Sequence, residues 1–396
     1  MKKNNWIFIM CYLSYAAIYV ARLNLSMASP AFKEMQLLNS TQIGLLGSVF
    51  SVVYAMGRLL NGVFGDRKPP RVMICFGLAL AGLSNLLIGF LPPFVGILLF
   101  WSVNAFAQSM LWSSVLCVVA QLYDAESTST KTSLMVTSVA TGNIIGILIN
   151  LYLIEHFGVR WAFIIPGAIT LLCGAINMVL LRALPATPKI QKPHMNMLQL
   201  LRNAQIRTSI GSSMIHGVMK DNITLWMTVF FVDRFAVNLE TSAYFVLFIP
   251  VVGFVGRSLY TPVYRLCGKE EHRVSVYGFA VCAVCAGVLC LPVLSPVVAM
   301  VCLSVIYAAV SMINTSFLSI YPLRYLESGN VASVSGVLDF STYLGAGIAS
   351  LCYGVIIEYF GYVPMFVSWL VLSTVAIGLA RALLRSIRTA EQTTTE

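Results

Sequence analysis

Residues 6–32 read WIFIMCYLSYAAIYVARLNLSMASPAF, an apolar run in which Arg22 is the only charged residue. The run exceeds the ~20 residues with which a helix crosses the hydrocarbon layer of a membrane, so it predicts a transmembrane helix. Three more cations, Arg58, Lys220 and Arg257, lie in other apolar runs. Placing a cation at the bilayer centre costs roughly 2.5–3.5 kcal/mol of insertion free energy, so such a residue indicates a function. Four such cations indicate that the protein binds an anionic ligand.

The composition is that of a chain built mainly from such helices. Of its 396 residues, 58% are hydrophobic and 10% are charged. Dividing the apolar runs at charged residues, prolines and glycines predicts an all-α membrane protein with twelve spans. We expect them at residues 6–30, 41–65, 71–91, 94–122, 131–157, 160–184, 206–233, 241–264, 272–291, 295–323, 331–358 and 362–384.

The formal net charge of +10 is expected to report membrane topology and not a nucleic-acid partner. An even number of spans places both termini on one side, and nearly all loop cations fall there; Lys33, Arg160 and Arg234 fall on the other side. Because cytoplasmic loops carry the excess of Lys and Arg, both termini are predicted to be cytoplasmic. The first span is too long for a signal peptide, so we expect a multi-pass protein of the plasma (bacterial inner) membrane.

A proline-rich polar segment divides the twelve spans into six and six. The two halves repeat: Gly57-Arg58 and Gly256-Arg257 are 199 residues apart, and the Glu-x-Phe-Gly sequences that begin at Glu155 and Glu358 are 203 apart. Duplicated halves are common in transporters. The predicted organisation is a bundle at 1–184, a cytoplasmic linker at 185–205, a second bundle at 206–388 and a cytoplasmic tail at 389–396.

The loop between the second and third spans carries a recognisable motif. Residues 62–71, GVFGDRKPPR, resemble the G-x-x-x-D-R-x-G-R-[KR] loop of the major facilitator superfamily, with Pro69 in place of a glycine. The resemblance implies two pseudo-symmetric six-helix bundles and a cytoplasmic gating loop, in which charge pairs latch and release the bundles. The gating residues would be Gly62, Asp66, Arg67 and Arg71.

Within that superfamily, the first span resembles the organophosphate:phosphate antiporters, the family of glycerol-3-phosphate and hexose-phosphate carriers. Its Tyr19, Arg22 and Asn24 match a Y-x-x-R-x-N pattern, and Arg58 stands where those carriers have an embedded lysine. Residues 108–112, QSMLW, resemble the family's Q-[GS]-x-x-W sequence. Lys220 falls near the family's second phosphate-binding arginine, 198 residues after Arg22. The resemblance implies that the substrate contacts are Arg22, Lys220, Arg58, Tyr19, Asn24, Gln108 and Trp112.

Three further charged residues are candidates for coupling or charge pairing. Lys220 and Asp221 are neighbours on one helix and point about 100° apart, so we expect each to find its partner on another helix. Asp339 could titrate if burial raised its pKa, or it could pair with a cation. Arg257 is placed by the repeat at the position of Arg58.

No phosphate-binding glycine loop, metal-ligand cluster or nucleophile–base pair is found, so no catalytic residue, metal or cofactor is expected and the protein is not expected to be an enzyme. The predicted function is secondary transport of a small anionic metabolite by alternating access, as a monomer. A phosphate ester exchanged for inorganic phosphate fits best. A proton-coupled carboxylate or sugar-acid symporter, or a transporter-like sugar-phosphate sensor, are the alternatives.

Overall fold

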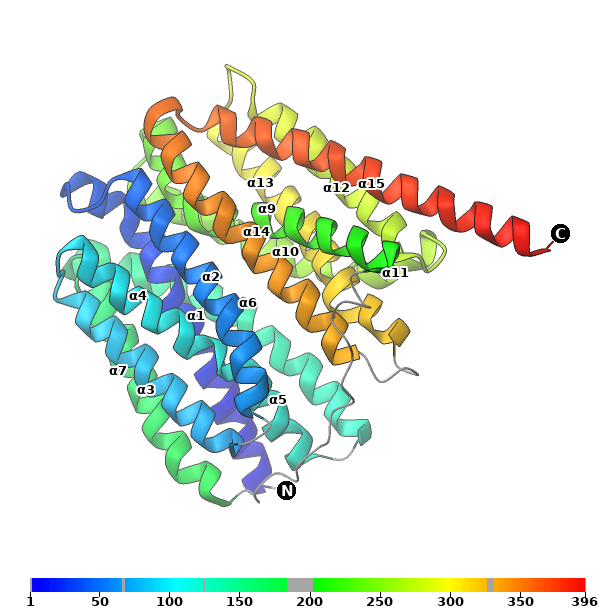
Figure 1. Cartoon of the computed structure of the whole chain (residues 1–396). Coiled ribbons are helices and arrows are strands. Elements are labelled where there is room, and N and C mark those ends of the chain that lie inside the picture. The colour runs from blue at the N-terminus through cyan, green and yellow to red at the C-terminus, as the bar shows by residue number, and fades with distance from the viewer. Residues whose placement is uncertain (1, 66–67, 124, 184–201, 326–330, 396) are drawn as a thin grey trace. The chain divides into compact units, whose positions relative to one another are not determined.

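The computed structural model describes residues 2–65, 68–123, 125–183, 202–325 and 331–395, and every regular element within these ranges is a helix (Figure 1). The helices before the predicted linker are α1 (Lys2–Glu34), α2 (Ser40–Gly65), α3 (Pro70–Gly89), α4 (Phe94–Ser109), α5 (Leu111–Leu122), α6 (Ala125–Phe157), α7 (Trp161–Leu180) and the short η1 (Leu181–Ala183). Those after it are α9 (Ala204–Phe235), α10 (Leu239–Ser258), α11 (Tyr260–Leu266), α12 (Glu271–Leu289), α13 (Pro296–Thr315), η2 (Ser316–Ile320), η3 (Tyr321–Tyr325), α14 (Val331–Phe360) and α15 (Val363–Thr395).

In this part of the chain, eleven helical segments are long and apolar enough to cross a membrane, and they coincide with eleven of the twelve predicted spans. The twelfth predicted span, 206–233, is α9. At 32 residues α9 has the length to cross a bilayer, but its middle carries His216, Lys220 and Asp221. The protein is therefore a multi-pass helical membrane protein, and its span α9 carries charged residues in its middle.

Two predicted spans are not one continuous α-helix. Residues 94–122 form α4 and α5, which meet at Met110. Residues 295–323 begin as the α-helix α13, continue as a π-helix at Ser316–Ile320 and end as a 3₁₀-helix at Tyr321–Tyr325. Pro322 lacks the backbone N–H that an α-helix needs, which helps to end the regular helix there.

The chain forms two compact units. Unit 1 consists of Met1–Gln191 with Leu225–Leu247, and unit 2 of Lys192–Thr224 with Phe248–Glu396. The later half of α9 belongs to unit 1 because it contacts the later half of α1: the Ser26 hydroxyl donates to the Leu225 carbonyl at 3.1 Å, and Lys33 pairs with Asp233. The units thus differ from a simple division at the linker. Most of the linker lies outside the described residues, and the boundaries 184 and 206 stay predictions.

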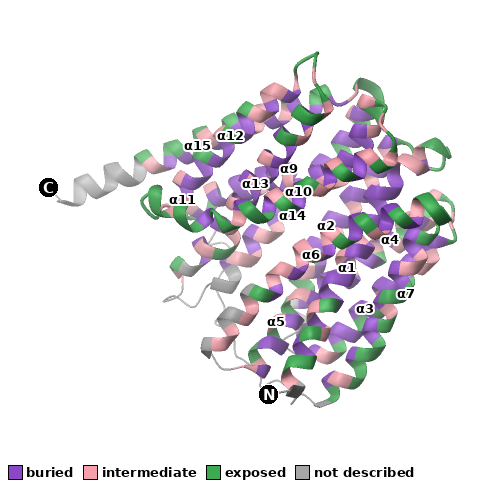
Figure 2. Ribbon diagram, turned by 180° about the vertical axis from the view of Figure 1, so that it is seen from behind, coloured by how far each residue is buried: buried purple, intermediate pink, exposed green. Residues whose placement is uncertain are grey.

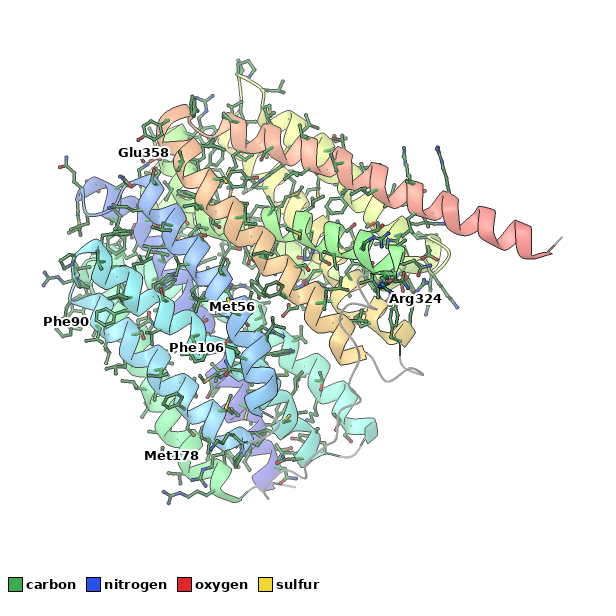
Figure 3. All side chains as sticks on the ribbon, in the orientation of Figure 1. Met56, Phe90, Phe106, Met178, Arg324 and Glu358 are labelled. Carbon is green, nitrogen blue, oxygen red and sulfur yellow. The ribbon has the colours of Figure 1, made fainter. Side chains whose placement is uncertain are left out.

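Burial follows the pattern expected of helices in lipid. Buried and exposed positions alternate around the helices in Figure 2, and many exposed side chains are large and apolar, among them Phe76, Leu99 and Val284. Met56 of α2 and Met178 of α7, labelled in Figure 3, are about half exposed, at 53% and 48%. In water such surfaces would favour association, whereas in a bilayer they contact acyl chains.

The internal repeat is visible in how glycines let helices approach. A Cβ placed on Gly57 of α2 would collide with Ser109 of α4, and one placed on Gly256 of α10 would lie 2.7 Å from the Ala308 carbonyl oxygen of α13. Gly256 follows Gly57 by 199 residues, and Ala308 follows Ser109 by the same offset. The same pair of contacts therefore occurs once in each half, as duplication requires.

A second pair of contacts repeats in the same way. A Cβ on Gly142 of α6 would lie 2.5 Å from the Ala16 carbonyl oxygen of α1, and a Cβ on Gly345 of α14 would lie 2.5 Å from the Met214 carbonyl oxygen of α9. Ala16 and Met214 are 198 residues apart, the offset that also relates Arg22 to Lys220. Arg22 and Lys220 thus occupy equivalent places on equivalent helices.

Gly217 provides a test of this close packing. A Cβ at Gly217 of α9 would collide with the carbonyl oxygen of Thr342 on α14, whereas a Cβ at the exposed Gly378 of α15 would meet nothing within 4 Å. We expect Gly217→Ala to lower the melting temperature by roughly 3–10 °C, because overpacking typically costs 1–3 kcal/mol. Gly378→Ala, the matched control, should melt at or above the wild-type temperature since alanine favours helix. Thermal unfolding in detergent, followed by intrinsic fluorescence, measures both; equal melting of Gly217→Ala and wild type would contradict the packing argument.

Candidate functional site

Arg22 lies half-buried on α1, with its guanidinium against three aromatic rings. Its Cζ atom is 4.5 Å from the ring centre of Phe50, 5.3 Å from that of Tyr54 and 5.9 Å from that of Tyr19. Phe50 and Tyr54 are one turn apart on α2, so both face the same way. Ring faces attract cations and offset part of the cost of removing a guanidinium from water without neutralising its charge.

Arg58 shares one of these rings. Its Nη1 donates to the Tyr54 hydroxyl at 3.4 Å, and its Cζ lies 5.8 Å from the Tyr54 ring centre. Tyr54 therefore contacts both cations, so the structure places Arg22 and Arg58 at the same ring. Sequence analysis missed Tyr54, although the four-residue spacing of Phe50, Tyr54 and Arg58 marks one face of α2. We call Tyr19, Arg22, Phe50, Tyr54 and Arg58 the arginine–aromatic cluster.

The predicted contact Trp112 borders this cluster through Tyr15. The Tyr15 ring centre is 5.0 Å from that of Trp112 and 5.6 Å from that of Tyr19. The hydroxyl of Tyr12, earlier in the same helix, shares hydrogen bonds with Thr137 and Thr141 of α6. The aromatic stripe of α1 thus joins packing inside unit 1 to the cluster around Arg22.

Asn24 and Gln108 belong to a network of buried amides, and neither is a member of the arginine–aromatic cluster. Asn24 donates to the Asn85 side-chain oxygen at 2.6 Å, Asn85 in turn donates to Asn104 at 3.4 Å, and Gln108 donates to Asn104 at 3.1 Å. All four amides are buried, so they form a network that joins α1, α3 and α4. A buried amide without a partner is costly, which gives these residues a structural reason to be polar. We therefore leave Asn24 and Gln108 out of the proposed substrate contacts.

Lys220 and Asp221 pair with each other, so the expectation that each would find its partner on another helix is wrong. The Lys220 Nζ lies 3.5 Å from the Asp221 Oδ1. The two backbone positions do diverge, but the flexible four-carbon stem of lysine lets its ammonium group reach back to the neighbouring carboxylate. The ammonium also lies 5.8 Å from the ring centre of Tyr343 on α14. Lys220 thus contacts one acid and one ring, and Arg22 contacts three rings.

The helix behind Lys220 is tightly supported. Asn222 donates to the Ala346 carbonyl at 3.4 Å and accepts from Ser350 at 3.0 Å, both on α14. His216, one turn before Lys220, is fully buried. Asp339 is half-buried one turn before Tyr343, so it lies on the side of α14 that carries Tyr343. Its role in coupling stays a prediction.

The other predicted residues lie at helix ends. Arg257 is half-buried near the end of α10, directly after Gly256. Gly62 falls in the last turn of α2 and Arg71 in the first turn of α3, where it is half-buried. Asp66 and Arg67 lie outside the described residues, so the gating loop stays a prediction.

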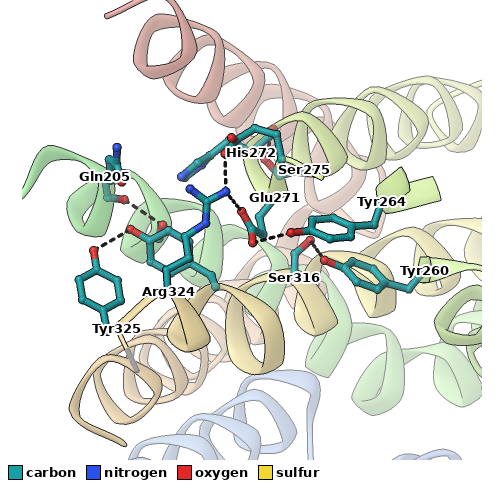
Figure 4. A network of polar contacts seen from close by, with 12 residues as sticks. Gln205, Tyr260, Tyr264, Glu271, His272, Ser275, Ser316, Arg324 and Tyr325 are labelled. Carbon is teal, nitrogen blue, oxygen red and sulfur yellow. Dashed lines mark hydrogen bonds and ion pairs between the residues drawn. The ribbon is translucent and has the colours of Figure 1, made fainter. Parts of the chain in front are cut away.

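A charged network that the sequence did not predict lies in unit 2. Arg324 of η3 bonds the Glu271 carboxylate at 2.5 Å and that of Glu270 at 3.1 Å, and the Tyr264 hydroxyl donates to Glu271 at 3.2 Å (Figure 4). Burial opposes the charge of Arg324, but the two carboxylates outweigh it and hold the pKa of Arg324 above its ordinary value. In the sequence, the adjacent acids Glu270 and Glu271 just before the span 272–291 could have indicated this network.

Among the described residues no group of three His, Cys, Asp or Glu could hold a metal ion. The chemistry on offer at the arginine–aromatic cluster and at Lys220 is the binding of an anion through cationic donors and hydroxyl groups. Arginine suits phosphate and carboxylate groups because its planar fork donates two parallel hydrogen bonds.

Comparison with known proteins agrees with this chemistry. The "Probable hexose phosphate transport protein" of Chlamydia trachomatis is 26% identical over 257 residues, which cover 61% of this chain and 56% of the relative. A "Membrane sensor protein UhpC" of Salmonella typhimurium is 29% identical over 178 residues, covering 44% of this chain and 39% of the sensor. The "Glycerol-3-phosphate transporter" of Haemophilus influenzae is 32% identical over 116 residues, covering 28% and 24%. The matches span about half or less of each relative, and they confirm the resemblance to organophosphate:phosphate antiporters.

Solved structures share the fold. A bacterial homologue of the human lysosomal transporter Spinster superimposes with a TM-score of 0.78 at 14% identity, covering 97% of both chains. The nucleoside transporter NupG gives a TM-score of 0.73 at 12% identity, covering 96% of this chain and 98% of that one. Both confirm the predicted twelve-helix fold. Residues 11–350 match the family model described as Major Facilitator Superfamily, and the chain belongs to that superfamily.

Proposed function

We propose that the protein is a secondary transporter that exchanges a phosphate ester for inorganic phosphate across the membrane. The observation that carries the proposal is the arginine–aromatic cluster, in which Arg22 and Arg58 meet at Tyr54 among apolar helices. Two cations that share one ring suit a ligand with more than one negative charge. The hexose phosphate and glycerol-3-phosphate carriers among the relatives name the class of ligand.

The geometry of Arg22 favours a phosphate group. A guanidinium held against ring faces can still donate hydrogen bonds from its edge, in the fork that matches phosphate oxygens. Arg58, bonded to the Tyr54 hydroxyl, would add attraction beside it. Tyr19 and Tyr54 would supply hydroxyl groups to the polar part of an ester, and Trp112 would border the site through Tyr15.

Lys220 is the proposed contribution of the second half of the chain. It stands at the position equivalent to Arg22, but it is already paired with Asp221 at 3.5 Å. An incoming phosphate would therefore compete with Asp221 for the Lys220 ammonium group. Such competition links ligand binding to a rearrangement around α9, which an exchange mechanism requires.

Transport would proceed by alternating access, driven by the gradients of the exchanged anions. Both termini would lie in the cytoplasm of a bacterial inner-membrane protein, and the monomer would be the working unit. Asp221, Asp339 and Arg257 would pair with other charges and need not carry protons. A proton-coupled carboxylate or sugar-acid symporter remains the alternative if either acid is found to titrate during transport.

A sensor is the second candidate function, because curated relatives include the UhpC sensor proteins. A sensor would bind the same phosphate ester without moving it at a useful rate. Binding together with saturable exchange in vesicles indicates a transporter, whereas binding without exchange indicates a sensor.

The principal test replaces Arg22 and measures exchange of radiolabelled inorganic phosphate in proteoliposomes. We expect Arg22→Ala to reduce exchange by about 10- to 100-fold, because a charge-assisted hydrogen bond contributes about 1.5–3 kcal/mol. Arg22→Lys should retain part of the exchange, since it keeps the charge and loses the fork. The matched control is Lys131→Ala: Lys131 also lies against two rings of unit 1, those of Phe8 and Tyr123, but outside the cluster.

Three outcomes are informative at equal protein loading. Loss of exchange in Arg22→Ala but not in Lys131→Ala supports the proposal. Equal loss in both variants would mean that any half-buried cation of unit 1 is needed, which contradicts a specific site. Absence of exchange in the wild type, with proton-driven uptake of a sugar acid in its place, would overturn phosphate antiport.

Tyr54→Phe tests whether the bridging hydroxyl matters. The change keeps the ring beside Arg22 and removes the hydrogen bond from Arg58. We expect the KM for the anion to rise about 3- to 10-fold, because a lost hydrogen bond is worth roughly 1 kcal/mol, with the melting temperature nearly unchanged. Tyr244→Phe is the control, since that hydroxyl lies on an exposed residue of α10 and donates to Glu240 at 3.5 Å. An unaltered KM in Tyr54→Phe would remove Tyr54 from the site.

A further inference from the structure

Cations gather at one end of α11, α12 and α15 in unit 2. Arg265, Lys269 and Arg273 surround the turn from α11 to α12, and Arg381 and Arg385 lie on α15, which packs against α12. The stretch from Val363 to Arg381 has as many residues as that from Glu271 to Leu289. Each stretch rises equally per residue and spans the same length, so a position 19 residues into α15 lies one α12 length from the start of α15. This side is the one that the charge distribution predicts to be cytoplasmic.

The acids next to this turn are already engaged. Glu270 and Glu271 both bond Arg324, and Glu271 also accepts from Tyr264 (Figure 4). Within the residues that the structure describes, no ion pair is formed by Arg265, Lys269, Arg273 or Arg381. The end of α11, α12 and α15 thus carries an uncompensated positive charge.

The turn itself has a fixed shape. Gly268 and Lys269 have φ values of +70° and +56°, and their N–H groups donate to the carbonyls of Arg265 at 3.0 Å and Tyr264 at 2.9 Å. The Arg273 guanidinium folds back over the turn, with Nη1 3.1 Å from the place where a Cβ of Gly268 would stand. The positive φ favours glycine at 268, and the lack of a side chain leaves room for Arg273. Two cations are therefore presented from one ordered turn.

Beyond the cations, the exposed surfaces of the same helices are apolar. Leu266, at the end of α11, is 87% exposed, and Val284 of α12 is 70% exposed. Val371 and Leu379 of α15 are about half exposed. A ligand that fits such a surface has an anionic head and a hydrocarbon tail. A water-soluble anion would gain nothing from the apolar part.

We propose that this end of α11, α12 and α15 binds the headgroup of an anionic phospholipid, with Lys269, Arg273 and Arg381 contacting its phosphate. Juxtamembrane cations attract anionic lipids on the cytoplasmic leaflet, and basic sites between helices bind their headgroups. The lipid would anchor unit 2 at its cytoplasmic edge. This site is separate from the arginine–aromatic cluster, which lies in unit 1.

The test is native mass spectrometry of the full-length protein with equimolar phosphatidylglycerol and phosphatidylethanolamine of identical acyl chains. We expect the wild type to retain phosphatidylglycerol preferentially. The double variant Lys269→Asn with Arg273→Gln should lower that preference by about tenfold or more, because each cation near an anionic surface contributes about fivefold. Asparagine is chosen at 269 because it tolerates positive φ. Arg381→Gln with Arg385→Gln, on the exposed side of α15, should lower the preference without touching the turn.

The matched control is Arg182→Gln with Arg202→Gln, two exposed cations on the same predicted side of the membrane. Retained preference in the control and loss in both test variants supports a defined lipid site. Equal loss in the control would show a diffuse attraction to basic loops and overturn the proposal, as would equal retention of both lipids by the wild type. Displacement of phosphatidylglycerol by millimolar inorganic phosphate would identify a phosphate site that does not need a lipid.

Discussion

Removing a cation from water costs free energy, and groups around the cation must offset that cost. The two halves of the chain do this with different groups. The faces of Phe50, Tyr54 and Tyr19 attract the Arg22 guanidinium, and a ring face carries no formal charge of its own. Lys220 is compensated by Asp221, which cancels its charge. A ring face does not compete with an anion for the cation, whereas a carboxylate beside a cation does compete with it.

This difference has arisen on a duplicated backbone. Gly142 lies against the Ala16 carbonyl in the first half, and Gly345 lies against the Met214 carbonyl in the second half. The two contacts are at equivalent positions. The helix contacts have therefore been kept while the charged side chains have diverged. In the proposed exchange, the first half would supply most of the attraction for the phosphate group. The second half would respond to it by releasing Asp221 from Lys220.

The sequence predicted the fold well because length and apolarity determine which segments cross a membrane. It also predicted Arg22 and Arg58 as substrate contacts, and their common contact with Tyr54 is a finding of the structure. It failed at Lys220 and Asp221, because helix geometry gives the direction of Cβ and not the reach of a long side chain. It could not show that Asn24 and Gln108 face neighbouring helices, since a polar residue in an apolar run has the same pattern whether it binds a helix or a ligand. Arg324 was missed because its partners come together only where α13 gives way to π- and 3₁₀-helix.

The buried amides explain why Arg22 can serve as a fixed donor. Asn24, two residues further along α1, bonds Asn85 of α3, while Asn150 of α6 donates to the Val20 carbonyl at 3.1 Å. Gly142 brings α6 against the same helix. The backbone on both sides of Arg22 is thus held by neighbouring helices before any ligand arrives. A donor whose position is already set loses less freedom on binding, so the polar residues that hold α1 would raise anion affinity without touching the anion.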